Sequence, residues 1–231
     1  MSIVLITGGN TGLGYESAKK LKTLGHKVYI GCRNEEKGKK AANELGVNYI
    51  QMDIIDDESV KNGIETLQQK EDHLDVLINN AGIPGSRIPA QEITADMMKK
   101  IYDVNVFGAV RVIHECLAML EKSDNPVIVN VSSGMGSFGQ VLNPDKIESK
   151  VTSPIYCSSK AALSMLSVQY SKALPQIKIN VVDPGPTKTG DNFSHGIQTV
   201  EEGIEAIIRM AIIDKNGPSG TFSNKDGILP W

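Results

Sequence analysis

Cysteine and histidine are scarce in this sequence. The 231 residues contain three cysteines, Cys32, Cys116 and Cys157, and four widely separated histidines. No Cys-x-x-Cys pair occurs, so neither a disulfide framework nor a structural zinc site is expected. The sequence therefore predicts a protein without a bound metal, in a reducing and cytoplasmic setting.

Long hydrophobic runs and an excess of charge of one sign are also missing. No stretch of 18 apolar residues occurs, and the opening MSIVLITGG has no basic segment. Neither a transmembrane helix nor a signal peptide is therefore expected. The formal net charge is −3 and no basic block is present, which argues against binding to nucleic acid or to an anionic membrane surface.

The sequence does contain a regular alternation of short apolar runs and longer helical patterns. Runs typical of buried strands lie at 3–6, 28–30, 47–50, 76–78, 127–131, 177–182 and, more weakly, 220–223. Helical patterns lie at 12–24, 35–45, 57–69, 94–121, 155–174 and 200–213. Short continuous apolar runs are typical of parallel strands that are covered on both faces. The order predicts a single doubly wound α/β domain of Rossmann type, with a parallel sheet of about seven strands and helices on both faces.

A glycine-rich segment, Thr7-Gly8-Gly9-Asn10-Thr11-Gly12-Leu13-Gly14, follows the first expected strand and opens the first helix. In this position Gly8 permits a tight turn, Gly12 lets the backbone approach a pyrophosphate, and Gly14 lets the helix pack closely on the strand. The start of the helix presents free N–H groups to the phosphates. The segment therefore predicts a dinucleotide site.

The spacing of this turn resembles the Thr-Gly-x-x-x-Gly-x-Gly signature of the classical short-chain dehydrogenase/reductase family. Further motifs of that family follow in its order: Asp53-Ile54, Asn79-Asn80-Ala81-Gly82, Asn105, Ser133, Tyr156-x-x-x-Lys160 and Pro184-Gly185. The motifs extend over residues 7–189. The long gap from Ser133 to Tyr156 and the tail from Gly217 to Trp231 are similar to those of the carbonyl-reductase-like members.

The resemblance implies a catalytic set of Asn105, Ser133, Tyr156 and Lys160. Tyr156 and Lys160 are four residues apart in an expected helix, so they share one face. The ammonium is expected to lower the pKa of the phenol from its ordinary value of about 10, and the phenol would exchange a proton with the substrate oxygen. Ser133 would hydrogen-bond that oxygen, and Asn105 would hold a water that links the lysine to solvent.

The resemblance also implies a nicotinamide cofactor. The residues that would bind it are Gly8, Asn10, Thr11, Gly12, Leu13, Arg33, Asp53, Ile54, Asn80, Ala81, Gly82, Tyr156, Lys160, Pro184, Gly185, Thr187 and Thr189. The single domain, residues 1–231, would then have a cofactor half at about 1–132 and a catalytic and substrate half at about 133–231.

The end of the second expected strand bears on the choice between NADP(H) and NAD(H). NAD-preferring relatives carry an acidic residue at about Cys32, and this sequence has Arg33 next instead. A guanidinium there can face a 2′-phosphate. Some NADP-dependent relatives carry a second basic residue where this chain has Thr11. The sequence favours NADP(H), and NAD(H) stays open.

These features together predict an NADPH-dependent reductase of small-molecule ketones, aldehydes or quinones. A 3-oxoacyl thioester reductase is an alternative within the family, although the long Ser133–Tyr156 gap argues against it. A non-catalytic dinucleotide-sensing protein is an alternative of another class, although such proteins typically lose the tyrosine or the lysine. Small residues on the Tyr156 helix slightly favour a homodimer over a monomer; they are Ser158, Ala161, Ser164, Ser167 and Ser171.

Overall fold

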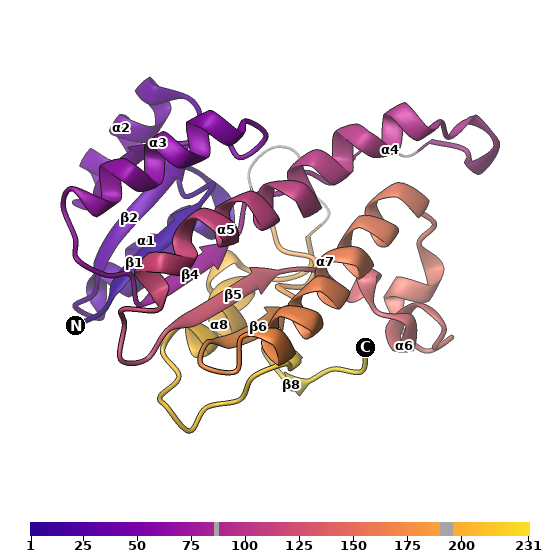
Figure 1. The fold of residues 1–231 in the computed structure, drawn as a ribbon. Helices are drawn as coiled ribbons and strands as arrows, with labels where there is room; N and C mark the ends of the chain where they lie inside the picture. Colours follow the sequence, from indigo (N-terminus) through magenta and orange to yellow (C-terminus); the bar gives the residue numbers. More distant parts are fainter. Residues whose placement is uncertain (86–87, 190–195) are drawn as a thin grey trace.

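A computed structural model describes residues 1–85, 88–189 and 196–231 and shows an α/β fold built on one sheet (Figure 1). Its strands are β1 (Ile3–Thr7), β2 (Lys27–Cys32), β3 (Asn48–Gln51), β4 (Val76–Asn79), β5 (Val127–Val131), β6 (Lys178–Val182), β7 (Phe222–Asn224) and β8 (Gly227–Ile228). Its α-helices are α1 (Gly12–Thr23), α2 (Glu35–Leu45), α3 (Asp57–Gln68), α4 (Ala95–Tyr102), α5 (Gly108–Leu120), α6 (Phe138–Val141), α7 (Pro154–Ala173) and α8 (Val200–Ala211). Shorter turns are η1 (Ala90–Glu92), the π-helical η2 (Asp103–Phe107), η3 (Gly134–Gly136) and η4 (Ile147–Lys150).

The strands are hydrogen-bonded in the order β3-β2-β1-β4-β5-β6-β7-β8. All neighbours are parallel except β7 and β8, which are antiparallel. The predicted doubly wound sheet is therefore confirmed, with β8 as an eighth strand that the sequence pattern did not predict. The strand order reverses between β1 and β4, and doubly wound folds bind ligands in the crevice outside the carboxyl ends of the strands at such a point.

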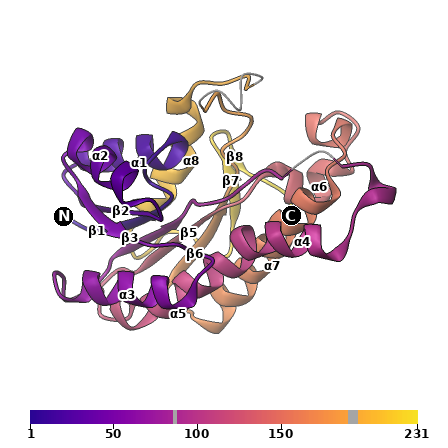
Figure 2. The ribbon, with the colours of Figure 1, turned by 90° about the horizontal axis from the view of Figure 1, so that it is seen from above.

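Each face of the sheet has its own hydrophobic core, because successive side chains of a buried strand point to opposite faces. Val4 and Ile6 of β1 belong to the cluster that includes side chains of α1, α2 and α8. Ile3 and Leu5 belong to the cluster that includes side chains of α3 and α5. Figure 2 shows the two layers, with α1, α2 and α8 on one side of the sheet and α3, α5 and α7 on the other.

A chain of buried hydrogen bonds joins α7 to the sheet. Asn79 Nδ2 donates to Asn130 Oδ1 (2.8 Å), and Asn130 Nδ2 donates to Ser167 Oγ (2.8 Å). The hydroxyls of Ser132 and Ser164 lie 3.0 Å apart. Two of the small residues on α7 that the sequence assigned to a subunit interface therefore face the sheet of their own chain.

The expected single helix over 94–121 is interrupted. The structure has α4, then the π turn η2, then α5. A π turn adds a residue to the helix and changes which face follows it. As a result α4 packs against α7, while α5 packs against α3 and β4. The predicted long helix is confirmed, because residues 95–120 are helical throughout, but the sequence pattern did not predict the π turn within it.

The segment between β5 and α7, which accounts for the long gap from Ser133 to Tyr156, contains η3, α6 and η4. It is fixed to the C-terminal segment: Ser137 Oγ donates to the Pro230 carbonyl (2.7 Å), and the Gly139 N–H donates to the Trp231 carbonyl (2.8 Å). The Trp231 ring stacks on Phe222 of β7 with centroids 5.5 Å apart. Within the described residues, no helix combines the length and hydrophobicity needed to cross a bilayer.

Candidate active site

Ser133 and Tyr156 meet at the carboxyl end of β5. Ser133 lies two residues beyond this strand, and Tyr156 lies in the first turn of α7. The Ser133 side chain lies close enough to the Tyr156 phenol to lower its pKa, and Ser133 Oγ accepts from the Met135 N–H (3.2 Å). The neighbouring Ser132 is buried, and its hydroxyl donates to the Lys160 carbonyl instead (3.1 Å). Of the two adjacent serines, Ser133 is therefore the one that the structure brings to Tyr156.

Lys160 lies one helical turn beyond Tyr156 and is almost completely buried. Its side chain is 5% exposed. Its Nζ donates to the Val131 carbonyl (2.9 Å) and lies 5.8 Å from the centre of the Tyr156 ring. Burial of the ammonium lowers the pKa of Lys160 to about 8. A small change in its surroundings can therefore change its charge near neutral pH.

The pKa of Tyr156 differs from the sequence-based expectation. Burial raises the pKa of the phenol to about 12, and the nearby Asp183 carboxylate acts in the same direction. The nearby Ser133 hydroxyl opposes both effects on this pKa. The expectation that Lys160 would lower this pKa was wrong for the protein alone, because burial disfavours the phenolate more strongly. The phenol is thus protonated at neutral pH.

Asn105 lies in the π turn η2, where it is joined to the chain segment after β4. Its Oδ1 accepts from the Ile83 N–H (2.8 Å), and its Nδ2 donates to the Ile83 carbonyl (2.9 Å) and to Ser159 Oγ (3.0 Å). A Cβ atom at Gly82 would lie 3.3 Å from both Asn105 Oδ1 and Lys160 Nζ. Asn105, Gly82 and Lys160 are therefore in close proximity, as the motifs imply.

The glycine-rich turn after β1 has the conformation that a phosphate site needs. Gly8 and Gly12 have φ angles of +65° and +58°, which favour glycine. Thr11 precedes α1 without a side-chain capping bond, and the first turn has no acidic residue, so its N–H groups are open to an anion. A Cβ at Gly14 would lie 2.5 Å from the Gly8 oxygen and from Asn80 Nδ2, so only glycine fits there.

Asn80 and Thr7 join this turn to the loop after β4. Asn80 Nδ2 donates to the Thr7 carbonyl (2.9 Å), and Thr7 Oγ1 accepts from the N–H groups of Asn80 and Ala81 (3.1 Å each). Sequence reasoning did not include Thr7 in the site, although it is the first residue of the glycine motif. Asn10 is half-buried in the same turn, and Leu13 packs within the core on the α8 side.

The end of β2 and the end of β3 carry the remaining predicted residues of the cofactor half. Cys32 is buried, and its thiol donates to the carbonyl two residues later (3.4 Å). Arg33, which follows directly, is exposed. Asp53 follows β3, with Oδ1 accepting from the N–H two residues later (3.4 Å), and Ile54 packs against Gly108 of α5. The positive charge of Arg33 is therefore accessible at the carboxyl edge of the sheet.

The loop after β6 holds Pro184, Gly185 and Thr187 in a turn. Thr187 Oγ1 donates to the Pro184 or Gly185 carbonyl (3.1 Å each), and Gln198 Nε2 donates to Thr187 Oγ1 (2.9 Å). The Thr187 hydroxyl is thus engaged within the turn, which leaves its backbone groups for a ligand. Sequence reasoning missed Gln198, for which no motif exists.

Thr189, in the loop after β6, lies beside the glycine-rich turn. A Cβ at Gly12 would lie 3.5 Å from the Thr189 Cβ. The structure therefore brings the loops after β1, β4, β5 and β6 together at the carboxyl edge of the sheet. The residues that the motifs predicted come together there, whereas Arg33 and Asp53 lie at its far end, after β2 and β3.

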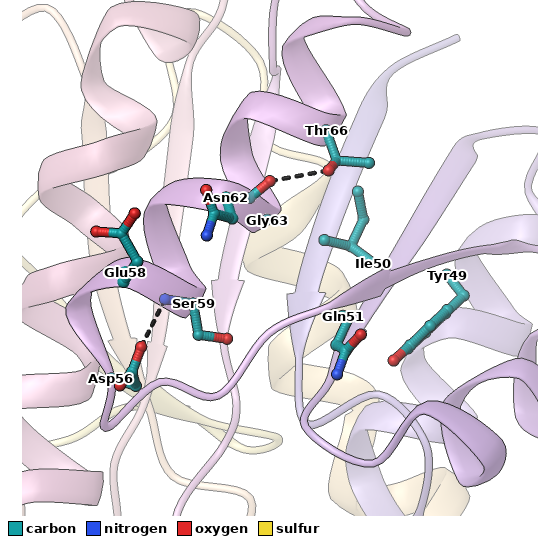
Figure 3. A pocket seen from close by; sticks show the side chains of 9 residues that line it. All are labelled: Tyr49, Ile50, Gln51, Asp56, Glu58, Ser59, Asn62, Gly63 and Thr66. Carbon is teal, nitrogen blue, oxygen red and sulfur yellow. Dashed lines mark hydrogen bonds between the residues drawn. The ribbon is translucent and has the colours of Figure 1, made fainter.

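A separate surface depression lies between β3 and α3 (Figure 3). Its polar side chains are partly bonded within α3: Asp56 accepts from the Ser59 N–H (2.6 Å), and the Thr66 hydroxyl donates to the Asn62 carbonyl (2.8 Å). Its lining includes none of the predicted site residues. The predicted site residues lie instead at the carboxyl ends of the strands.

Comparison with known proteins agrees with this geometry. The sequence pattern described as short chain dehydrogenase matches residues 2–195. The chain belongs to the short-chain dehydrogenase family. Short-chain dehydrogenase/reductase 1 of Saponaria officinalis is 31% identical to it, over 98% of this chain and 95% of the relative. The resemblance stated from the motifs is thereby confirmed.

Two solved structures have the same fold as this short-chain dehydrogenase. Carbonyl reductase Sniffer of D. melanogaster superposes with a TM-score of 0.85 and 25% identity and covers 100% of both chains. ElxO, solved with NADP bound, superposes with a TM-score of 0.81 and 28% identity and covers 97% of this chain and 96% of its own. Membership of the family makes this short-chain dehydrogenase an oxidoreductase.

Proposed function

We propose that this short-chain dehydrogenase uses NADPH to reduce the carbonyl group of a small molecule, namely a ketone, an aldehyde or a quinone. The observation that carries the proposal is the proximity of Ser133 and Tyr156, with Lys160 buried one turn further along α7. Similarity to a carbonyl reductase and to a structure with NADP bound supports the same reaction class.

The residues of the proposed site have separate roles in this reduction. Bound NADPH supplies the hydride to the carbonyl carbon. Ser133 donates a hydrogen bond to the carbonyl oxygen and orients it. Tyr156 gives that oxygen its proton, and the raised pKa of the phenol keeps this proton in place at neutral pH. Lys160 holds the ribose of the cofactor, and Asn105 fixes the loop beside it.

The structure fits an anionic dinucleotide along the carboxyl edge of the sheet. The left-handed glycines and the uncapped start of α1 suit the pyrophosphate. Exposed Arg33, with no carboxylate at position 32, suits the 2′-phosphate of NADP(H). Asp53 and Ile54 would contact the adenine, and the loop with Pro184, Gly185, Thr187 and Thr189 would hold the nicotinamide.

A homodimer is the assembly that we propose. Phe107 of η2 and Met165 of α7 are 47% and 59% exposed, on two helices that already pack against one another. Burial of these apolar side chains against a second copy would stabilise the pair. Light scattering is expected to give a mass of twice 24.9 kDa. A mass of 24.9 kDa would refute the dimer.

The proposed activity is tested by following NADPH consumption with a panel of ketones, aldehydes, quinones and a 3-oxoacyl thioester. We expect turnover of at least one of the first three classes and little with the thioester. Preferred turnover of the thioester would favour the alternative reductase. Tight binding of NADPH without turnover of any substrate would favour a dinucleotide sensor. Tyr156→Phe is the control that retains binding and loses turnover.

A further inference from the structure

Asp183 is a buried acidic residue that the family motifs do not account for. It follows β6 and is 7% exposed. Its Oδ1 accepts from the Gly185 N–H (2.9 Å), and its Oδ2 lies beside Gly134. Gly134 follows Ser133, whereas Gly185 belongs to the turn after β6. One carboxylate therefore joins the two loops that border the proposed reaction site.

The close approach of Gly134 makes this arrangement specific. A Cβ at Gly134 would lie 3.0 Å from Asp183 Oδ2 and 2.8 Å from Glu148 Oε1. A larger residue at position 134 would thus displace the carboxylates from the loop of Ser133. Gly134 is itself buried in η3, which packs against α7. The contact therefore lies between Ser133 and the helix that carries Tyr156 and Lys160.

Three ionisable groups face Asp183 from the elements packed around it. Lys160 and Tyr156 come from α7, and Glu148 comes from η4. Among the described side chains no carboxylate lies within ion-pair distance of Lys160, so its charge is balanced only at longer range. Asp183 raises the pKa of Lys160 against the effect of burial, and it raises the pKa of Tyr156 as well. Burial and the Glu148 carboxylate raise the pKa of Asp183, whereas the Gly185 N–H and the Lys160 ammonium lower it.

We propose that Asp183 is a positioning residue of the reduction: its carboxylate joins the Ser133 turn to the Gly185 turn and supplies the negative charge that balances the buried Lys160 ammonium. The inference rests on the proposed function for the reaction that it serves. It adds a residue outside the Asn105, Ser133, Tyr156 and Lys160 set. Asp183 touches neither the substrate nor the cofactor in this proposal, and it acts through Ser133 and Lys160.

The replacement Asp183→Asn tests the charge of the side chain at position 183 while keeping its shape. The amide has the size of the carboxylate and can still accept the Gly185 N–H, but it carries no charge. Glu148→Gln is the matched control, because it removes a neighbouring negative charge that does not act directly on Lys160 or Tyr156. A purely structural Asp183 would alter stability without changing the pH dependence.

The first measurement is the dissociation constant of NADPH, from its fluorescence, between about pH 6 and about pH 10. In the wild type, affinity should fall as the pH rises through the pKa of Lys160, about 8. Loss of the charge at 183 lowers the pKa of Lys160, so the fall in Asp183→Asn should begin at lower pH. The midpoint of the fall should lie about 0.5–1 pH unit lower than in the wild type or Glu148→Gln.

The second measurement is kcat/KM for carbonyl reduction over the same range. The reaction needs the Lys160 ammonium to hold the cofactor, so its alkaline limit near the Lys160 pKa of about 8 should also move to lower pH in Asp183→Asn. Coincident pH profiles for Asp183→Asn, Glu148→Gln and wild type would overturn the proposal, even if kcat fell. If Asp183→Asn does not fold, as judged by thermal unfolding, Asp183→Ser provides the same uncharged test. Absence of carbonyl turnover in the wild type would overturn the proposed function, whereas the pH dependence of NADPH binding would still decide the role of Asp183.

Discussion

Ser132 and Ser133 are adjacent in the chain, and the structure predicts opposite consequences when either is replaced by alanine. Ser132 Oγ is buried and bonds the Lys160 carbonyl and Ser164 Oγ. Ser133 Oγ is half-buried beside Tyr156 and accepts from the Met135 N–H. The first hydroxyl holds α7 to the sheet, and the second is available to a substrate.

The expected magnitudes differ accordingly. Ser132→Ala leaves buried partners without a hydrogen bond, which should lower the free energy of unfolding by about 1–3 kcal/mol. The melting temperature should fall by about 2–4 °C for each kcal/mol in a chain of this size. Ser133→Ala should change stability by less than about 1 kcal/mol, because water can replace its partners. It should lower kcat by roughly a hundred- to a thousandfold, as loss of one oxyanion-binding donor does.

Both variants can be compared in one pair of assays, thermal unfolding and NADPH consumption with the best carbonyl substrate. We expect Ser132→Ala to melt earlier and to retain most of its activity at a temperature where it is folded. We expect Ser133→Ala to melt like the wild type and to be nearly inactive. Equal losses of kcat in the two variants would refute the assignment of Ser133 to the substrate oxygen.

Three further predictions concern the proton donor, the cofactor and the buried lysine. Tyr156→Phe should lower kcat by roughly a hundred- to ten-thousandfold while leaving the NADPH dissociation constant unchanged, and rapid turnover would exclude the phenol as the acid. Arg33→Ala should raise the dissociation constant of NADPH about tenfold and leave that of NADH unchanged in fluorescence titrations. A tenfold effect is at the lower end for a charged hydrogen bond, because the Arg33 side chain is exposed. Lys160→Met should abolish turnover but raise the free energy of unfolding in urea at neutral pH by about 1–3 kcal/mol. The unfolded chain binds more protons than the folded chain between the folded pKa of about 8 and the ordinary value of 10.5, so wild-type stability rises over that range. The advantage of the methionine should therefore disappear above about pH 10, and an advantage that does not depend on pH would contradict the reasoning.

The sheet and most helices could be predicted because their signals are local and repeated. The strand over 127–131 and the helix over 35–45 have the predicted bounds, and other elements differ by one or a few residues. Such elements follow from apolar runs and from glycines that end helices. The antiparallel β8 could not be predicted, because two residues carry no periodicity and their pairing depends on β7.

The interruption at η2 had no sequence signal for a different reason. The apolar pattern over 94–121 continues through the π turn, and the turn is fixed by the bonds of Asn105 to Ile83 and Ser159, which are distant in the chain. The same applies to the segment between β5 and α7, whose position depends on Pro230 and Trp231. Tertiary contacts, and not local propensity, therefore determine the π turn and the position of this segment.

The candidate site was predictable where a family motif names its residues and not where contacts define them. Family motifs identified Asn105, Ser133 and Lys160 as site residues, and the structure brings these residues together. Gln198 is a single polar residue in an irregular stretch, and only the folded chain shows that it bonds Thr187. The pKa of Tyr156 could not be inferred either, because it depends on burial.

The position of β1 between β2 and β4 has a consequence for synthesis of the protein on the ribosome. Leu5 pairs with Tyr29 on one side but with Leu77 on the other, and the chain between Leu5 and Leu77 is about 70 residues long. At synthesis rates of about 5–20 residues per second, the apolar edge of β1 remains unpaired for roughly 4–14 seconds. An unpaired edge of this kind can join another nascent chain. Co-translational chaperones therefore have their main opportunity to protect this protein before β4 has been made.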